Sequence, residues 1–445
     1  MARLKQLWSD MRASFWFLPC LIVALAVTLA FVLTHLDESA LEQWMKRYPN
    51  LFGASAAGAR EMLSTIAGSM ISVVGIVFSM TLVALALASS QYSSRVLRTF
   101  MRSRVTQTSI GIFAGIFVYC LIVLRGVHGK DESVFVPVLA VSAAMLLAVV
   151  GVVVLIFFIH HIALSIQAST ILANIAEETI DAMQSMFRPQ DAAAAGEPAH
   201  TEADVKKVLA TLCWIPIPAM NSGYLQSIDY TILLKVASER RLIVRVERAV
   251  GQFVLAGTPL FSVAGERAAS LDGTLNATIA VSAYRTVEQD PGFGVRQLVD
   301  VALKALSPGV NDTTTAVMCL DYLGAVMATM GRLAIPSPYQ YDQGALKIIA
   351  AGPDYADMLG EAFDQIRRDS GGNVSVILRM IAVIDTLSAL VVGEGRRDDL
   401  RAQLEFLAEL GARTVAAPQD STLIASALAP VRRSLAITSP QRRKV

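Results

Sequence analysis

Residues 64–90 read STIAGSMISVVGIVFSMTLVALALASS, and the interpretation of the whole chain starts from this stretch. From Leu63 to Ser90 the chain carries no formal charge over about 28 residues, which is long enough to cross a bilayer as a tilted helix. Small and hydroxyl-bearing residues recur in it every three or four positions. At roughly 100° per residue these positions share one face of a helix. They are Ser64, Gly68, Ser72, Gly75, Ser79, Ala86 and Ser90, interrupted by Leu82.

The opposite side of this predicted helix is apolar, and we expect it to face lipid or to pack against other helices. Its residues are Ile66, Met70, Val73, Val77, Met80 and Leu87. A basic run follows the helix, and we expect it at the inner mouth of the membrane segment. It consists of Arg95, Arg98, Arg102 and Arg104.

The composition divides the 445-residue chain into an apolar half and an ordinary half. Charged residues make up 17%, against roughly 25% in soluble proteins, and 54% of the residues are hydrophobic. The apolar excess ends near Ile162. A net charge of +1 gives no reason to expect a nucleic-acid partner. Neither a disulfide framework nor a zinc site is indicated by Cys20, Cys120, Cys213 and Cys319.

Four membrane spans are predicted, over residues 15–36, 62–90, 108–124 and 134–159. The first has a basic start but is too long for a signal peptide, so we expect an uncleaved helix. Basic residues are denser before the first span and between the second and third. This bias favours a multi-pass protein of the bacterial inner membrane with both termini in the cytoplasm.

The fold class expected is an α-helical integral membrane domain, residues 1–161, followed by a cytoplasmic α+β domain. Residues 162–187 lack Pro and Gly and predict a helical extension of the fourth span. A linker over 188–203, a small β-containing module over 204–270 and a mainly helical module over 271–445 follow. Residues 244–263, VRVERAVGQFVLAGTPLFSV, resemble half of a barrel-sandwich of the biotinyl or lipoyl type. The lysine that such carriers modify is absent there, so we expect no cofactor.

Within the soluble half, Asp229 should cap a helix that runs through Arg240. Strands are expected over 242–246, 260–263 and 341–351. Helices are expected over 295–306, 313–330, 355–368, 374–392, 397–410 and 421–433.

The motifs of common enzyme classes are absent from the sequence, so we expect no enzyme and no metal site. The densest polar stretch, residues 285–317, contains a predicted turn at Asn311, Asp312, Thr313 and Thr314. A helix N-terminus bearing these residues could bind an anion or a small polar ligand through free N–H groups. The alternative is a turn that simply caps its own helix.

Several blocks of sequence together resemble the DUF2254 family of predicted bacterial membrane proteins. They are STIAGSMISVVGIVFSMTLVALALASSQYSSRVLRTFMR, FVYCLIVLR, RTVEQDPGFGVRQLVDVALKALSPGVNDTTTAVMCLD and FDQIRRDSGGN. The family pattern often has proline after the Asn-Asp pair, where this chain has Thr313. The resemblance implies a bacterial membrane location and an architecture, but no reaction.

Two function hypotheses follow. In the first, the chain forms a homo-oligomeric, channel-like pore lined by the Ser/Gly face of the second span, with a small ion as the conducted species and a cytoplasmic regulatory domain. In the second, that face is a helix-packing seam, within one subunit or between subunits. The protein would then be a membrane-anchored ligand sensor or scaffold.

Overall fold

The computed structural model describes residues 16–35, 55–91, 104–130, 133–189, 205, 209–265, 270–350 and 352–436. These residues divide into two compact units, Met1–Thr170 and Ile171–Val445, which we call unit 1 and unit 2. Each unit is described by itself.

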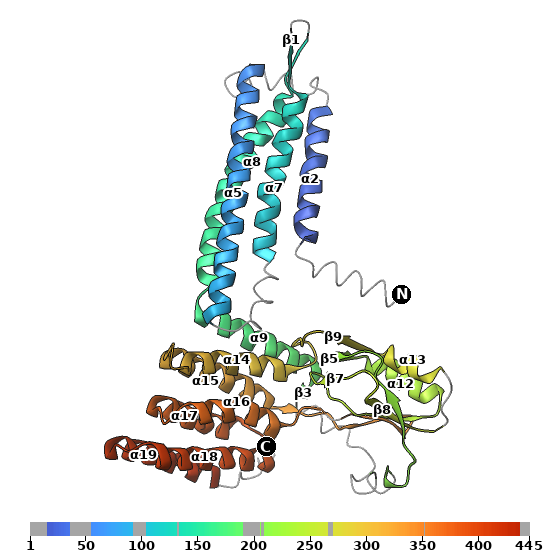
Figure 1. The fold of residues 1–445 in the computed structure, drawn as a ribbon, viewed down its shortest axis with the longest axis vertical. Coiled ribbons are helices and arrows are strands. Elements are labelled where there is room, and N and C mark those ends of the chain that lie inside the picture. The colour runs from blue at the N-terminus through green and yellow to red at the C-terminus, as the bar shows by residue number, and fades with distance from the viewer. Residues whose placement is uncertain are drawn as a thin grey trace, which may run out of the picture. The chain divides into compact units, whose positions relative to one another are not determined.

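Unit 1 is a bundle of long apolar helices (Figure 1). Its elements are α2 (Phe17–His35), α5 (Ala56–Gln91), α7 (Arg104–Gly126), β1 (His128–Lys130), β2 (Ser133–Phe135) and α8 (Val138–Ser165). The N-terminal end of α2 and the C-terminal end of α8 lie at one end of the bundle, and the β1–β2 hairpin lies at the other. Arg60 of α5 donates two hydrogen bonds, of 2.7 and 3.2 Å, to the carbonyl of Val127 just before the hairpin.

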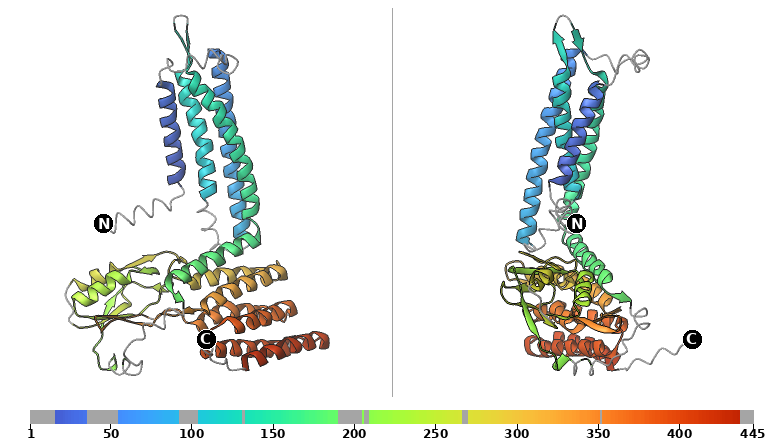
Figure 2. Two further views of the ribbon diagram at one scale, coloured as in Figure 1. Left: turned by 180° about the vertical axis from the view of Figure 1, so that it is seen from behind. Right: turned by 90° about the vertical axis from the view of Figure 1, so that its right-hand side faces the viewer.

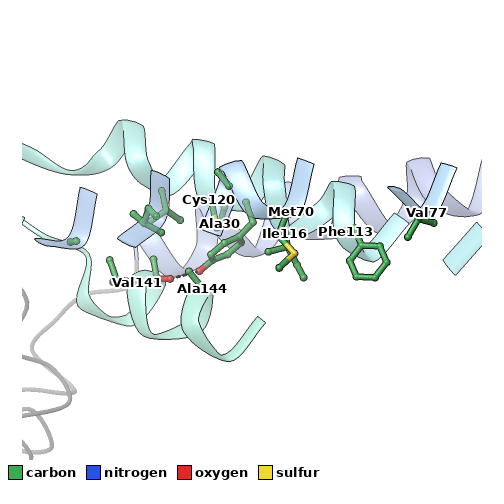
Figure 3. Close-up of a cluster of buried hydrophobic side chains, with 14 of the residues drawn as sticks. Ala30, Met70, Val77, Phe113, Ile116, Cys120, Val141 and Ala144 are labelled. Atoms are coloured by element: carbon green, nitrogen blue, oxygen red, sulfur yellow. Dashed lines mark hydrogen bonds between the residues drawn. The ribbon is translucent and has the colours of Figure 1, made fainter. Parts of the chain in front are cut away.

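Helix α7 is the centre of the bundle, because its contacts with α2, α5 and α8 are the most extensive among the four helices. The side chains of Phe113, Ile116 and Cys120 on α7 are at most 2% exposed and meet Met70 of α5 and Ala144 of α8 (Figure 3). The Tyr119 hydroxyl, also buried, donates a 2.8 Å hydrogen bond to the Ala140 carbonyl. That bond satisfies the only polar group of a side chain that otherwise fills the apolar core.

The structure divides the predicted extension of the fourth span into two helices. Helix α8 ends at Ser165, and α9 (Ala168–Met186) begins after two intervening residues. The Ser165 hydroxyl donates a 2.7 Å hydrogen bond to the His161 carbonyl, and the Gln167 N–H donates one to the Leu164 carbonyl. These local bonds end α8 without a proline or glycine, and most of α9 belongs to unit 2.

Unit 2 contains a β-module with two principal sheets. The five-stranded sheet has the order β11 (Tyr339–Asp342), β12 (Ala345–Ile349), β6 (Ile243–Val246), β8 (Pro259–Ala264), β4 (Ile215–Pro218). The three-stranded sheet has the order β7 (Phe253–Val254), β5 (Gly223–Ile228), β9 (Ile279–Ser282). Helices α12 (Tyr230–Glu239) and α13 (Leu271–Asn276) share their core, which contains Leu225, Leu233, Val244, Phe261 and Leu275. A short pair joins β3 (Arg188–Pro189) to β10 (Leu333–Ala334).

The rest of unit 2 is an array of helices stacked in layers (Figure 2). They are α14 (Pro291–Leu306), α15 (Thr313–Met330), α16 (Tyr355–Asp369), α17 (Val374–Leu390), α18 (Glu394–Thr414) and α19 (Pro418–Ala436). Contacts run along one row, α14–α16–α18, and along a second, α15–α17–α19. Side-chain caps start five helices of the unit at Asp229, Asp290, Asp312, Asp354 and Asn373.

The structure differs from the expected layout of the soluble half in three places. One strand was expected over residues 341–351, but residues 341–349 lie in the hairpin of β11 and β12, which turns at Gln343-Gly344 with positive φ. Strand β12 pairs in parallel with β6, so the β-module draws on residues beyond 270. Helix α14 begins at Pro291, four residues before the expected start, because the Asp290 carboxylate accepts from the Phe293 N–H.

Candidate functional site

The Ser/Gly face of α5 points away from the bundle. Ser64, Gly68, Ser72, Gly75 and Ser79 are all exposed in the single subunit. The buried residues of α5 lie on the other side of the helix, where Leu63, Ala67, Met70, Val77 and Ala84 pack into the core. The apolar side that the sequence assigned to lipid or packing is therefore the packing side, and the small residues are left at the outer surface.

Open space lies over both glycines of this face. A Cβ built on Gly68 or on Gly75 would meet no other atom within 4 Å. Among the described residues, therefore, no helix of the same subunit uses these glycines for close approach. If the face is a packing seam, its partner is not among the described residues of the same subunit.

Two serine hydroxyl groups on α5 bond to its own backbone. Ser72 donates 2.9 Å to the Gly68 carbonyl, and the neighbouring Ser69 donates 2.8 Å to the Thr65 carbonyl. Both hydroxyl hydrogens are used inside the helix, so the oxygens present lone pairs outward as acceptors.

The inner end of the face is only partly described. Ser90 belongs to helix α5, and Arg104 is the exposed first residue of α7. Arg95, Arg98 and Arg102 lie outside the described residues.

The predicted ligand turn lies between α14 and α15, and the structure brings its four residues together. The Asp312 carboxylate accepts from the Thr315 N–H at 3.0 Å and from the Thr315 hydroxyl at 2.5 Å. These bonds hold the pKa of Asp312 below its usual range. The Thr313 hydroxyl accepts a 2.9 Å hydrogen bond from the side-chain amide of Asn373. The backbone of Asn311 is in the left-handed region, with a φ of 49°. A carboxylate of the chain itself thus occupies the position that an anion would take at this helix N-terminus.

Sequence reasoning missed the close-packing seam that operates inside the subunit. It lies on α7, where a Cβ on Gly111 would be 2.8 Å from Ile22 Cδ1 and one on Gly115 would be 3.3 Å from Ala26 Cβ, both on α2. The two glycines are four residues apart in the sequence GIFAG. This G-x-x-x-G spacing, common where membrane helices approach closely, was the signal that could have found the seam.

A cluster of charges lies at the start of α14, within the densest polar stretch of the sequence, residues 285–317, and its one member that the sequence did not indicate is Glu361. Arg285 binds Asp290 with two hydrogen bonds, of 2.7 and 3.0 Å, and Asp290 is 7% exposed. Arg296 pairs with Asp300 at 3.0 Å. Glu361 of α16 faces both pairs, and its burial raises its pKa above the usual range although the two arginines lower it. Glu361 is 71 residues from Asp290, so no local spacing announces it.

The described residues offer little for metal or small-molecule chemistry. They contain no group of three or more His, Cys, Asp or Glu side chains placed to share a metal ion. A cavity of about 240 Å³ opens beside β9, lined by Met220, Asn221, Gly273, Asn276, Ala277, Ile279 and Val281. The Asn276 side chain is already bonded there to the Pro218 and Asp272 carbonyls and to the Met220 N–H.

Five helices in the described part of the chain are long and apolar enough to cross a membrane: α2, α5, α7, α8 and α15. The first four overlap the four membrane spans predicted from the sequence. Helix α15 packs against α14 and α17, and this contact buries Leu320, Leu323 and Met327.

Comparison with known proteins places the chain among predicted membrane proteins. The family described as "Predicted membrane protein (DUF2254)" matches residues 12–386. Uncharacterised proteins of Mycobacterium bovis and Mycobacterium tuberculosis are each 29% identical to it over 437 residues, covering 96% of this chain and 82% of theirs. No solved structure matches the chain.

Proposed function

This chain belongs to the DUF2254 family of predicted membrane proteins, and we propose that it is a homo-oligomeric, multi-pass protein of the bacterial inner membrane. Helices α2, α5, α7 and α8 cross the bilayer together as one bundle. Helix α15 is instead a core helix of the helical array, because its apolar residues are used in packing on α14 and α17. With four spans and the basic residues concentrated around the inner ends, both termini lie in the cytoplasm.

The observation that carries the proposal is the outward position of Gly68 and Gly75 on α5. Lipid chains do not favour small residues at a helix surface, whereas a second helix does, since small residues let two backbones approach. We assign this face to contacts between subunits.

Around a symmetry axis the same face would line a narrow path through the oligomer, and a channel-like pore is the function it supports best. Ser72 uses its hydroxyl hydrogen within α5, so at this position the path presents a hydroxyl oxygen, and the face carries no formal charge. Arg104 and the arginines before it then lie at its inner mouth. Unit 2 would serve as the regulatory domain.

Cysteine cross-linking in bacterial membranes tests the subunit contact. Cys20 and Cys213, the exposed native cysteines, are first replaced by serine. Ser72→Cys should give a disulfide-linked dimer on oxidation. Phe78→Cys is the matched control, since Phe78 is also exposed but lies about 120° around the helix. Equal cross-linking at both positions, or at neither, refutes the contact.

Ion flux into liposomes containing the purified protein tests the pore. Gly75→Leu, which fills the proposed path, should abolish the flux that the unchanged protein supports. Cross-linking at Ser72 without any flux would leave the oligomer and replace the pore by the scaffold hypothesis.

A further inference from the structure

Asp290, which caps α14, and the first four residues of the helix, Pro291 to Gly294, contact three other parts of unit 2. These residues, which we call the DPGFG segment, meet α9 on one side, the loops of the β-module on another and α16 on a third. Five residues that touch three separate elements can transmit a movement of one element to the other two.

The contact with α9 is a close crossing at Gly294. A Cβ on Gly294 would lie 1.8 Å from Thr179 Oγ1 and 2.9 Å from Thr179 Cβ. Thr179 is fully buried, and its hydroxyl donates 2.6 Å to the Ile175 carbonyl, which fixes the side chain on α9. No side-chain layer separates the two helices here, so α9 cannot approach α14 without pushing its backbone.

The contact with the β-module runs through Asp290. Arg285, in the loop after β9, holds both carboxylate oxygens of Asp290, and this pair is largely buried. Gly251, in the turn between β6 and β7, has a φ of 90°, and a Cβ there would lie 2.2 Å from Asp290 Oδ2. Gln289, the residue before Asp290, accepts a 3.0 Å hydrogen bond through its side-chain oxygen from the Ile228 N–H of β5. Bidentate charged bonds and a backbone seated against the carboxylate make this a stiff attachment.

The contact with α16 involves Gly292. A Cβ on Gly292 would lie 3.5 Å from Glu361 Oε2 and 3.5 Å from Met358 Sδ. One turn further along α14, Arg296 donates 2.7 Å to the Gln365 side chain of α16. Helix α16 is therefore also in direct contact with the start of α14.

We propose that the DPGFG segment is a mechanical joint that passes displacements of α9 to the β-module. Helix α9 follows α8 after two residues, so it is the part of unit 2 that a rearrangement of the apolar helices would move first. The steric contact at Gly294 receives the movement. The Asp290–Arg285 bonds hold the Asp290 carboxylate in place, and its contact with Gly251 delivers the movement to residues 249–252. The contacts concerned lie within unit 2, so the joint does not depend on the pore proposal.

Native-state hydrogen exchange on the full-length protein in detergent tests the joint. Gly294→Ala forces α9 and α14 apart and should speed exchange of α9 amides and also of the 249–252 turn, whose Gly251 N–H is bonded to Leu225. We expect an increase of roughly tenfold at both places, which corresponds to about 1.4 kcal/mol. Adding Thr179→Gly removes the clash and should slow exchange again at both places.

The matched control is Gly324→Ala, because its Cβ would lie 2.8 Å from Val383 Cγ1 at the α15–α17 crossing. It should speed exchange in α15 and α17 and leave the 249–252 turn unchanged. Faster exchange in α9 alone after Gly294→Ala, or an equal effect of both variants on the turn, overturns the proposal.

A reciprocal variant covers the case in which Gly294→Ala does not fold. Arg285→Lys keeps the positive charge but loses the bidentate pair of hydrogen bonds to the Asp290 carboxylate. Since coupling is reciprocal, it should speed exchange in α9 as well as in the turn. Unchanged α9 exchange in this variant would also refute the joint.

Discussion

Alanine at position 111 is expected to destabilise the bundle of unit 1, whereas alanine at position 68 is not. A Cβ on Gly111 would lie 2.8 Å from Ile22 Cδ1 and 3.0 Å from Pro19 Cα, and the Pro19 backbone cannot rotate away. Overpacking of this kind costs about 1–3 kcal/mol. The better helix propensity of alanine offsets about 1 kcal/mol. Within one subunit, Gly68→Ala meets open space and keeps only the stabilisation from helix propensity.

The two variants should therefore differ by about 2 kcal/mol in unfolding free energy, which amounts to roughly 4–8 °C in thermal midpoint for a domain of this size. The midpoint is read in detergent as the temperature at which half of the monodisperse protein is lost from size exclusion. A Gly111→Ala protein that melts with or above the Gly68→Ala protein would show that α2 does not approach α7 through Gly111.

Three further outcomes follow from single contacts. Tyr119→Phe leaves the buried Ala140 carbonyl without its 2.8 Å partner and should lower the unfolding free energy by about 1–2 kcal/mol, measured as a lower thermal midpoint. Asp312→Ala removes the cap of α15 and should cost about 1 kcal/mol in urea unfolding. Hydrogen bonds from Thr315 lower the pKa of Asp312 in the folded protein. The stabilisation by this cap is therefore present above the pKa that Asp312 has in the unfolded chain, and it is lost as pH falls through its pKa in the folded protein. The stability of the variant should then converge on that of the wild type in acid. Burial raises the pKa of Glu361 in the folded protein, so its ionised form destabilises the fold as pH rises through that pKa. Glu361→Gln should therefore gain stability relative to wild type between acidic and neutral pH, measured by urea unfolding.

Local signals in the sequence predicted the helices and their starts well. Asp229 caps α12 and Asp312 caps α15, as the pattern of a polar residue before an apolar periodic run indicates. Helix α15 has the predicted bounds, Thr313 to Met330. These features depend on residues close together in the chain, so a single sequence carries the information.

Features that depend on distant contacts were not predictable in the same way. The parallel pairing of β12 with β6 joins residues about 100 positions apart, and nothing in either strand specifies the other. Glu361 joins the Arg285–Asp290 cluster only because α16 packs on α14. The helical pattern of α5 showed two faces but not which one the bundle would bury, since small residues suit close packing inside a subunit as well as between subunits.

The energetics of α5 separate the contribution of its hydroxyl groups from that of its glycines. The Ser72 hydroxyl is bonded to the Gly68 carbonyl, so it needs no partner outside the helix and lipid could cover it at little cost. Glycine differs, because within a helix it costs about 1 kcal/mol relative to alanine. At Gly111 the close approach of α2 offsets that cost. At Gly68 and Gly75 no described residue does so, and a neighbouring subunit packed on these positions would supply the missing contacts. The two glycines, rather than the serines, therefore favour an oligomer.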